Sequence, residues 1–583
     1  MTYADPDMTA GERPARGLGS GVWAIERAFE RSKTANRPID DTQLRIVFIL
    51  AIFAAAFLFL ATGATRAALF SEAARGGRSG PVAAARGDLV DRNGLLLAMN
   101  LVHYGVYLDP AEVWDSVETR QKLKAALPKL SAVRLEKALK RDKRSLLFGG
   151  LTPQDKARIR DLGLPGISFE PEDRRVYPLG AQASHVIGFT DFGGRGLAGA
   201  EKALDADLIA AGADGGTVAL SIDLRVQAAL EDEVQKAGSE HRAKGAVGIV
   251  TDVRTGEVLA MASYPDFHPG DPGAASPDQL LNRPVQSVYE MGSTFKGITI
   301  AAGLDSGAIT RESTFDATQP FRMAGRTIRD FHATNRVLTT DLVFTKSSNI
   351  GTSRIAMAVG PDKFSGYLRD LGLFDKAAVE LKESARPILP AKWNEGTLAS
   401  ASFGHAISVS PLALAGAMNA IANGGYRIPM TIKKQEGPAP KGVRVLKPET
   451  SRAMLELMRL NVLEGSGRKA DVPGLSVGGK TGTGEKVVNG RYDSRANISS
   501  FAAVFPTDGP LDAQRYFVLI LVDEPLGSEA TFGLRTGGWV AAAPVGHTIA
   551  RIAPFLKVKP VQPIAVPENA ELAAAAILAA DRR

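Results

Sequence analysis

Residues 46–65 form an uninterrupted stretch of 20 residues without a charged side chain, IVFILAIFAAAFLFLATGAT. As an α-helix this stretch would be about 30 Å long, which is the thickness of the hydrocarbon core of a membrane. It is too long for a cleavable signal peptide, and 45 residues precede it. We therefore expect one membrane-spanning helix, with a helix buried in a large core as the alternative. Four cationic residues shortly before the stretch and three shortly after it leave its orientation open.

The chain contains no cysteine among its 583 residues, which excludes a thiolate nucleophile, a disulfide and a cysteine-bound metal. Its seven histidines include no pair at the i, i+3 or i+4 spacing with which one helix face binds a metal. We expect no metal and no cofactor, although a carboxylate metal site stays open. The 70 Lys and Arg residues nearly balance the 63 Asp and Glu residues, so the charge does not indicate a nucleic-acid partner.

Changes in composition and in hydrophobic pattern divide the chain into five parts. A polar tail precedes the apolar stretch, a mixture of short strand patterns and helical patterns follows it, and a proline-spaced, alanine-rich tail ends the chain. The large part before that tail begins with a hairpin around Thr255-Gly256, continues with helices, and ends with strong strands and a closing helix. That order predicts an α/β sandwich. Earlier, residues 103–109 predict a strand and residues 133–147 a helix with a solvated basic face. The five parts are residues 1–43, 44–66, 67–240, 241–558 and 559–583.

Gly194, Gly196 and Gly199 match the dinucleotide-binding pattern GxGxxG, and Asp223 follows at nearly the expected distance. Two features oppose a dinucleotide site. The strand before the glycines is short, and the bulky Arg195 stands where the backbone would have to approach a pyrophosphate. A helix entered through a flexible turn is the preferred interpretation.

Residues 474–481 match the phosphate-loop pattern GxxxxGK[ST], and the apolar strand ending at Asp523 resembles its metal-binding partner. A phosphate loop must continue directly into a long helix. Here two glycines, Gly482 and Gly484, follow at once, and Asn489-Gly490 turns the chain soon afterwards. These residues predict a strand and a hairpin and make a phosphate-loop NTPase the weaker alternative.

A third set of residues occurs in the order Ser293-Thr-Phe-Lys296, Ser347-Ser-Asn349 and Lys480-Thr-Gly-Thr483. Each motif alone is weak, but the three in this order are specific. Gly292 precedes a helical stretch, so Ser293 is expected at a helix N-terminus with Lys296 one turn further on the same face.

The residue types suit nucleophilic catalysis by serine. A serine hydroxyl needs a base within hydrogen-bond reach, and Lys296 can be that base if burial or a nearby cation such as Lys480 lowers its pKa. Ser347 can relay a proton and Asn349 can hold a substrate amide. Thr481 and Thr483, on either side of Gly482, can bind a carboxylate. The backbone N–H groups of Ser293 and Thr483 can form an oxyanion hole.

These three motifs resemble the S-x-x-K, S-x-N and K-T-G motifs of the penicillin-binding acyltransferases. The resemblance covers nearly the whole chain after the apolar stretch and extends to the class B members. One departure is Glu290-Met291-Gly292, where many relatives have proline before the glycine. The form of the second motif and the lack of a large insertion resemble the septal, division-specific branch. The segments similar to class B motifs are residues 86–94, 174–178, 185–188, 199–201, 403–405 and 422–425.

The resemblance implies a fold, a reaction and a location. The fold is an elongated α+β pedestal of the dimerisation type (67–240) and a transpeptidase domain (241–558) with an antiparallel sheet between helices. In the reaction, Ser293 attacks the D-alanyl-D-alanine bond of a peptidoglycan stem peptide and forms an acyl-serine intermediate, and β-lactams acylate the same serine. A single-pass protein of the bacterial inner membrane is implied, with its catalytic domain in the periplasm. The implied partners include a SEDS-family (FtsW-like) glycosyltransferase and other division proteins.

Four alternatives stay open from the sequence. An elongation-specific class B transpeptidase shares the motifs. A β-lactamase or β-lactam sensor shares the chemistry, but no E-x-x-L-N run for a deacylating glutamate follows Asn349, and the nearest similar run, residues 278–282, precedes Ser293. A non-catalytic scaffold that binds division partners is another. The phosphate-loop NTPase is the least favoured.

Overall fold

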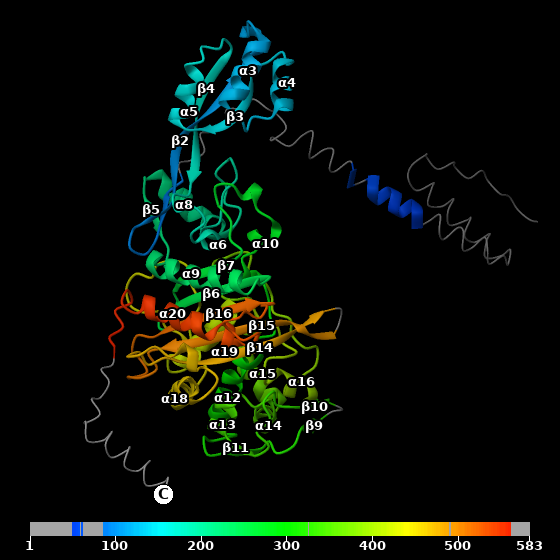
Figure 1. The fold of residues 1–583 in the computed structure, drawn as a ribbon, viewed down its shortest axis with the longest axis vertical. Coiled ribbons are helices and arrows are strands. Elements are labelled where there is room, and N and C mark those ends of the chain that lie inside the picture. The colour runs from blue at the N-terminus through cyan, green and yellow to red at the C-terminus, as the bar shows by residue number, and fades with distance from the viewer. Residues whose placement is uncertain (1–48, 59, 62–85, 324–325, 489–490, 561–583) are drawn as a thin grey trace, which may run out of the picture. The chain divides into compact units, whose positions relative to one another are not determined.

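The computed structural model describes residues 49–58, 60–61, 86–323, 326–488 and 491–560 (Figure 1). The chain separates into two units, residues 1–82 and 83–583. In the first unit, residues 49–58 and 60–61 are helical and exposed. Within the described residues no helix has the length and apolarity needed to cross a membrane. The predicted tail 1–43, about half of the predicted span 44–66 and nearly all of the predicted tail 559–583 lie outside the described residues.

The second unit begins with a mixed sheet of strand order β3-β2-β1-β5, in which β4 also pairs with the long strand β2. β2 runs antiparallel to β1, β3 and β4, whereas β1 runs parallel to β5. Three helices with side-chain N-caps pack on this sheet around a small core of their own. The bounds are β1 Asp88–Val90, β2 Leu96–Leu108, α3 Ser116–Ala126, α4 Ala132–Leu139, β3 Ser145–Leu151, α5 Pro153–Arg160, β4 Ile167–Val176, α6 Ser184–Ile187, α7 Gly199–Ala203, α8 Asp205–Ala213 and β5 Thr217–Ala219.

The helix predicted over residues 133–147 is wrong in its second half. Helix α4 ends at Leu139, and Ser145–Leu151 forms strand β3. Gly149 and Gly150 weaken a helix there, and the strand places Leu147 and Leu151 in the core of this region, whereas the basic run between the two elements is exposed. Tertiary packing therefore decided the conformation against local helical propensity.

A buried ion cluster joins distant parts of this first domain. Glu201 is fully buried and accepts from Arg86 at 2.6 Å and from Arg175 at 2.7 Å. Arg86 also pairs with Asp205 at 2.6 Å. Three segments that the sequence analysis compared with class B motifs, at residues 86–94, 174–178 and 199–201, thus meet at one carboxylate.

At the glycines of the dinucleotide-like pattern, one backbone segment packs closely against another. A β-carbon at Gly199 would lie 2.5 Å from the amide nitrogen of Gly188, and one at Gly196 would overlap the carbonyl of Glu201. Gly199 starts the short helix α7. The predicted helix entered through a turn is confirmed, and backbone fills the space beside two of the three glycines.

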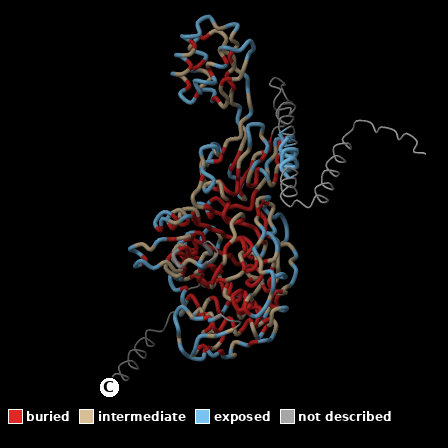
Figure 2. Tube along the Cα trace, turned by 90° about the vertical axis from the view of Figure 1, so that its right-hand side faces the viewer, coloured by how far each residue is buried: buried red, intermediate tan, exposed pale blue. Residues whose placement is uncertain are grey.

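The rest of the second unit is built on a five-stranded sheet of order β14-β15-β16-β6-β7, antiparallel throughout. Every residue of β6 and β16 is buried, because helices cover both faces of the sheet. Helices α9 and α20 pack on one face, and α17 and α18 lie with α12 on the other (Figure 1). Buried residues, drawn red in Figure 2, fill the interior between these layers. The predicted antiparallel sheet between helices is confirmed. The bounds are α9 Leu224–Glu240, β6 Gly245–Asp252, β7 Val258–Tyr264, α10 Pro277–Leu280, α11 Arg283–Gln286, α12 Lys296–Asp305, β8 Thr314–Asp316, β9 Phe321–Met323, β10 Arg326–Ile328, β11 Val337–Thr339, α13 Thr340–Thr345, α14 Asn349–Val359, α15 Pro361–Asp370, α16 Glu395–Ala401, α17 Pro411–Ala422, β12 Tyr426–Arg427, β13 Val443–Arg444, α18 Pro448–Glu464, β14 Gly478–Val488, β15 Arg491–Phe505, β16 Tyr516–Asp523, α19 Gly537–Val540 and α20 Ala542–Ile552.

The segment that resembles a phosphate loop is a strand, as predicted. Lys480 lies in β14 opposite Ala502 of β15, and no helix follows it. Asp523, the candidate metal ligand of the NTPase interpretation, is paired with Lys486 at 2.8 Å. The backbone geometry of residues 478–488 therefore contradicts a phosphate-loop NTPase.

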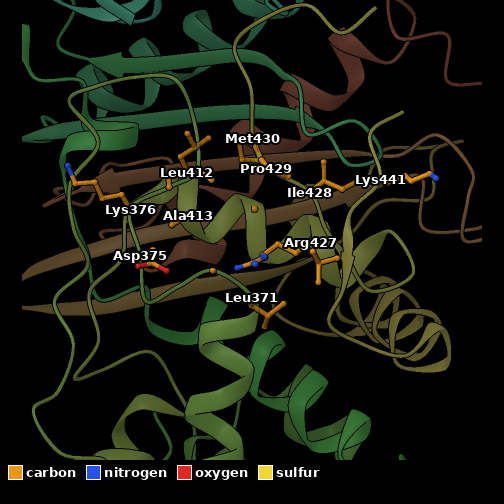
Figure 3. A pocket seen from close by; sticks show the side chains of 15 residues that line it. Leu371, Asp375, Lys376, Leu412, Ala413, Arg427, Ile428, Pro429, Met430 and Lys441 are labelled. Atoms are coloured by element: carbon orange, nitrogen blue, oxygen red, sulfur yellow. The ribbon is translucent and has the colours of Figure 1, made fainter. Parts of the chain in front are cut away.

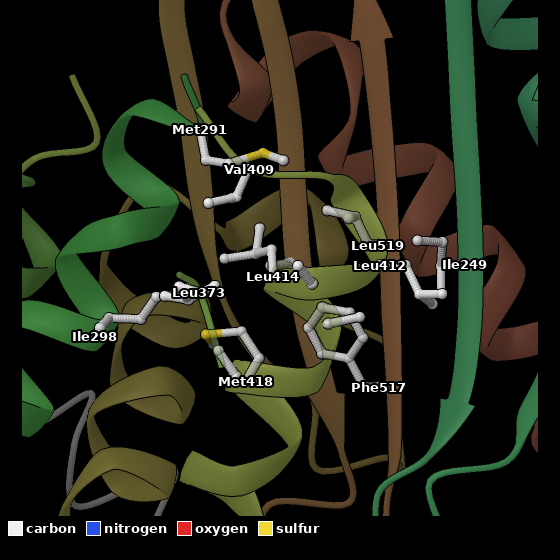
Figure 4. Close-up of a cluster of buried hydrophobic side chains, with 14 of the residues drawn as sticks. Ile249, Met291, Ile298, Leu373, Val409, Leu412, Leu414, Met418, Phe517 and Leu519 are labelled. Carbon is white, nitrogen blue, oxygen red and sulfur yellow. The ribbon is translucent and has the colours of Figure 1, made fainter. Parts of the chain in front are cut away.

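Helix α17 is the apolar centre of the helical layer (Figure 4). Its Leu412, Leu414 and Met418 pack in one cluster with Ile298 of α12 and with Phe517 of the sheet. The methyl carbon of Met418 lies 3.8 Å from the position that a β-carbon would take at Gly297. Helix α17 thus supports α12 directly beside Lys296.

Candidate active site

Ser293 lies on a short 3-10 turn, Gly292–Phe295, and α12 begins only at Lys296. The expected single helix is therefore tighter in its first turn. Gly292 has a φ of +55°, and a β-carbon there would overlap the carbonyl oxygen of Thr483. This left-handed residue and the close contact set the turn, which leaves Ser293 partly exposed and Lys296 fully buried.

Three of the predicted residues, one from each motif, form a triangle in which two lysines donate hydrogen bonds to one serine. The Nζ of Lys296 donates to the Oγ of Ser347 at 3.1 Å and also to the carbonyl oxygen of Ser347. The Nζ of Lys480 donates to the same Oγ at 2.9 Å. The hydroxyl of Ser347 thus connects the amine of α12 to the amine of β14.

Both lysines have strongly perturbed acid–base behaviour. Burial, and then the charge of Lys480, lower the pKa of Lys296 well below its ordinary value. Burial lowers the pKa of Lys480 to about 7. A buried amine that loses its proton near neutral pH can accept a proton from a serine hydroxyl.

Ser347 is held in an unusual backbone conformation, with a φ of +57°. The next residue, Ser348, caps α14 by accepting from the amide of Gly351 and donates to Asp330 at 2.7 Å. Asp330 also accepts from the amide of Ile350 at 3.0 Å. These bonds stabilise the turn that aims Ser347 at the lysines, and such strain is typical of functional sites.

The other predicted residues lie around this triangle with partners of their own. The side-chain amide of Asn349 donates to the carbonyl of Arg329 at 3.0 Å. The Oγ1 of Thr481 lies 2.7 Å from the Oγ of Ser466 and 3.4 Å from the Nζ of Lys480. The Oγ1 of Thr483 accepts from the amide of Gly537 at 3.1 Å. A β-carbon at Gly482 would overlap the Oγ of Ser500 and lie 2.8 Å from the carbonyl of Met291.

Strand β14 is the edge strand of its sheet, so one row of its backbone groups faces the serine turn. The carbonyl of Thr483 points at Gly292 and not at β15. In an antiparallel strand the N–H and the C=O of one residue point to the same side. The N–H of Thr483 is therefore directed to the open edge, on the side of Ser293.

Sequence reasoning missed Glu290 and His405. The half-buried carboxylate of Glu290 accepts from the amide of Ala406 at 2.8 Å and from the hydroxyl of Tyr492 at 3.2 Å, and it lies 3.4 Å from the Nδ1 of His405. Burial, and then Lys296, lower the pKa of His405 to about 4, so this imidazole is neutral at pH 7. Asp330 was missed as well. The sequence analysis had included His405 in the family-like segment 403–405 and Glu290 in the departure before Ser293, but it gave neither a role, and nothing in the sequence indicated Asp330.

Comparison with known proteins agrees with this geometry. Residues 246–548 match the penicillin binding protein transpeptidase domain, and residues 81–208 match the penicillin-binding protein dimerisation domain. The chain belongs to the class B penicillin-binding proteins, in which these two domains follow one another. The predicted resemblance and the two-domain fold are thereby confirmed.

Individual relatives show which members of this family the chain resembles. The chain is 57% identical over 546 residues to the probable peptidoglycan D,D-transpeptidase FtsI of Caulobacter vibrioides, covering 92% of this chain and 93% of that protein. It is 30% identical to the peptidoglycan D,D-transpeptidase FtsI of Escherichia coli K12, covering 82% and 85%. Among solved structures, penicillin-binding protein 3 of Mycobacterium tuberculosis in complex with aztreonam superposes with a TM-score of 0.64 at 27% identity, covering 82% of this chain and 98% of that one.

Proposed function

We propose that this chain is a peptidoglycan D,D-transpeptidase that cross-links stem peptides through an acyl-serine intermediate on Ser293 and that β-lactams inactivate at the same serine. The observation that carries the proposal is the triangle of Lys296, Ser347 and Lys480 at the turn that carries the partly exposed Ser293. The identity to proteins named FtsI supports the septal branch over the elongation-specific one.

In the acylation step, the Oγ of Ser293 attacks the carbonyl of the D-alanyl-D-alanine bond while the neutral amine of Lys296 accepts the hydroxyl proton. The backbone N–H groups of Ser293 and Thr483 stabilise the oxyanion. The C–N bond then breaks, and Ser347, bonded to both lysines, passes a proton to the departing D-alanine. Thr481, Gly482 and Thr483 hold the terminal carboxylate of the substrate beside Lys480, and Asn349 holds an amide of the stem.

In the second step the amine of a neighbouring stem peptide attacks the acyl ester. Its proton returns through the same groups to the Oγ of Ser293, which restores the enzyme. No protein carboxylate among the described residues takes part in the Lys296–Ser347–Lys480 triangle. The triangle thus lacks the dedicated carboxylate with which a class A β-lactamase activates its water, which favours a transferase over a β-lactamase.

The test is the lifetime of the adduct with benzylpenicillin, followed by mass spectrometry of the intact chain. We expect a covalent adduct of one penicillin per chain, located on the peptide that contains Ser293, which persists for at least an hour after free penicillin is removed. Release within seconds would identify a β-lactamase, and absence of an adduct would contradict the proposed chemistry altogether.

We further propose that residues 44–66 anchor the chain in the bacterial inner membrane, with the pedestal (67–240) and the transpeptidase domain (241–558) in the periplasm. The uncharged stretch 46–65 supports this, as does a reaction whose substrate is wall peptide. A SEDS-family glycosyltransferase and other division proteins are the proposed membrane partners. The full chain should stay with membranes in alkaline carbonate and be released when residues 46–65 are deleted. Equal sedimentation of both forms would refute the anchor.

A further inference from the structure

A cavity of about 330 Å³ lies in the transpeptidase domain among residues that form no part of the serine site (Figure 3). Its walls come from the end of α15, the loop after it, one side of α17, and the chain around β12 and β13. Leu412 and Ala413 of α17 and Met430 make the cavity largely apolar. This volume is at the lower end of the range for ligand sites, so it suits a small molecule or the end of a peptide.

The guanidinium of Arg427 points into the middle of this cavity (Figure 3). The stem of Arg427 crosses Gly372, where its Cδ lies 3.5 Å from the position of an absent β-carbon. Within the part of the chain that the structure describes, this half-buried guanidinium has no hydrogen bond and no ion pair. An arginine held over an apolar floor with its donors unused is suited to bind a carboxylate in a bidentate manner.

The charges at the rim favour an anion. Lys376 and Lys441 are exposed on opposite sides, and Asp375 is the one carboxylate among the lining residues (Figure 3). The lining thus holds three cations, counting Arg427, against one anion.

We propose that this cavity binds a small carboxylate with an apolar body, with the carboxylate on Arg427 and the apolar part against Leu412, Ala413 and Met430. The carboxyl terminus of a short apolar peptide and a short fatty acid share this chemistry. The site does not depend on the proposed reaction. It does share α17 with the active site, because Met418 on that helix packs beside Gly297, next to Lys296.

The experiment uses the purified full-length chain after acylation with benzylpenicillin, so that the serine site is occupied. Calorimetric titrations with acetyl-leucyl-alanine and with sodium hexanoate identify the source of the carboxylate. We expect saturable binding of at least one of them, and binding at least tenfold weaker for its amide, acetyl-leucyl-alaninamide or hexanamide. Absence of saturable binding for both carboxylates, or equal binding of acid and amide, would overturn the proposal.

Three variants locate the site. Arg427→Gln should weaken binding at least tenfold by removing the cation, and Ala413→Leu should weaken it comparably by filling the floor while keeping every charge. Arg452→Gln removes an exposed arginine of α18 outside the cavity and should leave binding unchanged. Equal affinities in Arg427→Gln and Arg452→Gln would place the binding elsewhere. The two test variants change different properties of the cavity, so poor folding of one does not remove the test.

Discussion

Replacement of Ser293 by alanine is expected to abolish the covalent adduct with penicillin while the fold stays intact. Ser293 is partly exposed, and within the described residues its hydroxyl makes no hydrogen bond, so alanine leaves no buried partner unsatisfied. We expect the free energy of unfolding to change by less than about 0.5 kcal/mol. Labelling with a fluorescent penicillin should fall below about one-thousandth of the wild-type rate, because the proposed nucleophile is removed.

The matched control for this variant is Ser306→Ala. Ser306 follows α12 at its other end, and its hydroxyl donates to the carbonyl of Gly303 at 3.1 Å. This variant should label at the wild-type rate. Labelling of the Ser293→Ala chain at the same rate as the control would show that another residue is the nucleophile.

Replacement of Lys296 by methionine is expected to separate activity from stability. Methionine keeps an unbranched apolar chain of similar length but cannot accept the proton of Ser293. General-base catalysis contributes about 10²–10⁴ in rate, so the rate of acylation by penicillin should fall by that factor. Stopped-flow or gel-based acylation kinetics measure the loss, and Lys236→Met on the exposed part of α9 is the control.

The same substitution should raise the free energy of unfolding near neutral pH. The pKa of Lys296 is lowered on folding from its ordinary value of 10.5, so folding near neutral pH requires the loss of a proton. Between the folded-state pKa and 10.5 the unfolded chain binds more protons, and the stability of the wild type therefore rises with pH by up to about 1.4 kcal/mol per pH unit from this residue. The increase in the free energy of unfolding of the variant is reduced by about 1–3 kcal/mol, because Ser347 loses the hydrogen bond from its buried donor.

Urea unfolding at pH 7 and at pH 9 tests this argument. The stability advantage of Lys296→Met over the wild type should be larger at pH 7 and should shrink at pH 9. An advantage that is equal at both pH values, or that grows with pH, would mean that Lys296 is protonated in the folded protein and is not the proposed base.

The elements that could be predicted from the sequence are those specified by local pattern. Two glycines directly after Lys480 and the turn at Asn489-Gly490 were enough to predict strand β14 against the phosphate-loop motif. Residues 133–147 were misjudged, because burial of Leu147 and Leu151 in a sheet outweighs a helical pattern of charges. Helix propensity and burial in a sheet each contribute only a small free energy per residue. The packing of the folded chain therefore determines which conformation forms.

The residues of the site also fall into those that local sequence could predict and those that it could not. Order and spacing were sufficient to propose Ser293, Lys296, Ser347 and Lys480, and the structure brings the last three together. Asp330 and Glu290 accept from backbone amides that lie 20 and 116 positions away in the chain, respectively. Nothing in local sequence encodes such long-range contacts, and an isolated acidic residue is most often only a solvated charge. The supporting residues therefore had to come from the structure.

The contact between the serine turn and β14 constrains how this protein could evolve resistance to an antibiotic. Gly292 and Gly482 meet the opposite segment backbone to backbone, and Gly404 closes on Gly292 in the same way. A side chain at any of these positions would push the proposed oxyanion donors, the N–H groups of Ser293 and Thr483, apart for stem peptide and drug alike. Selection for an enzyme that admits one acyl donor and refuses the other must therefore act on exposed side chains beside the site, such as Tyr492, which can change without moving this backbone contact.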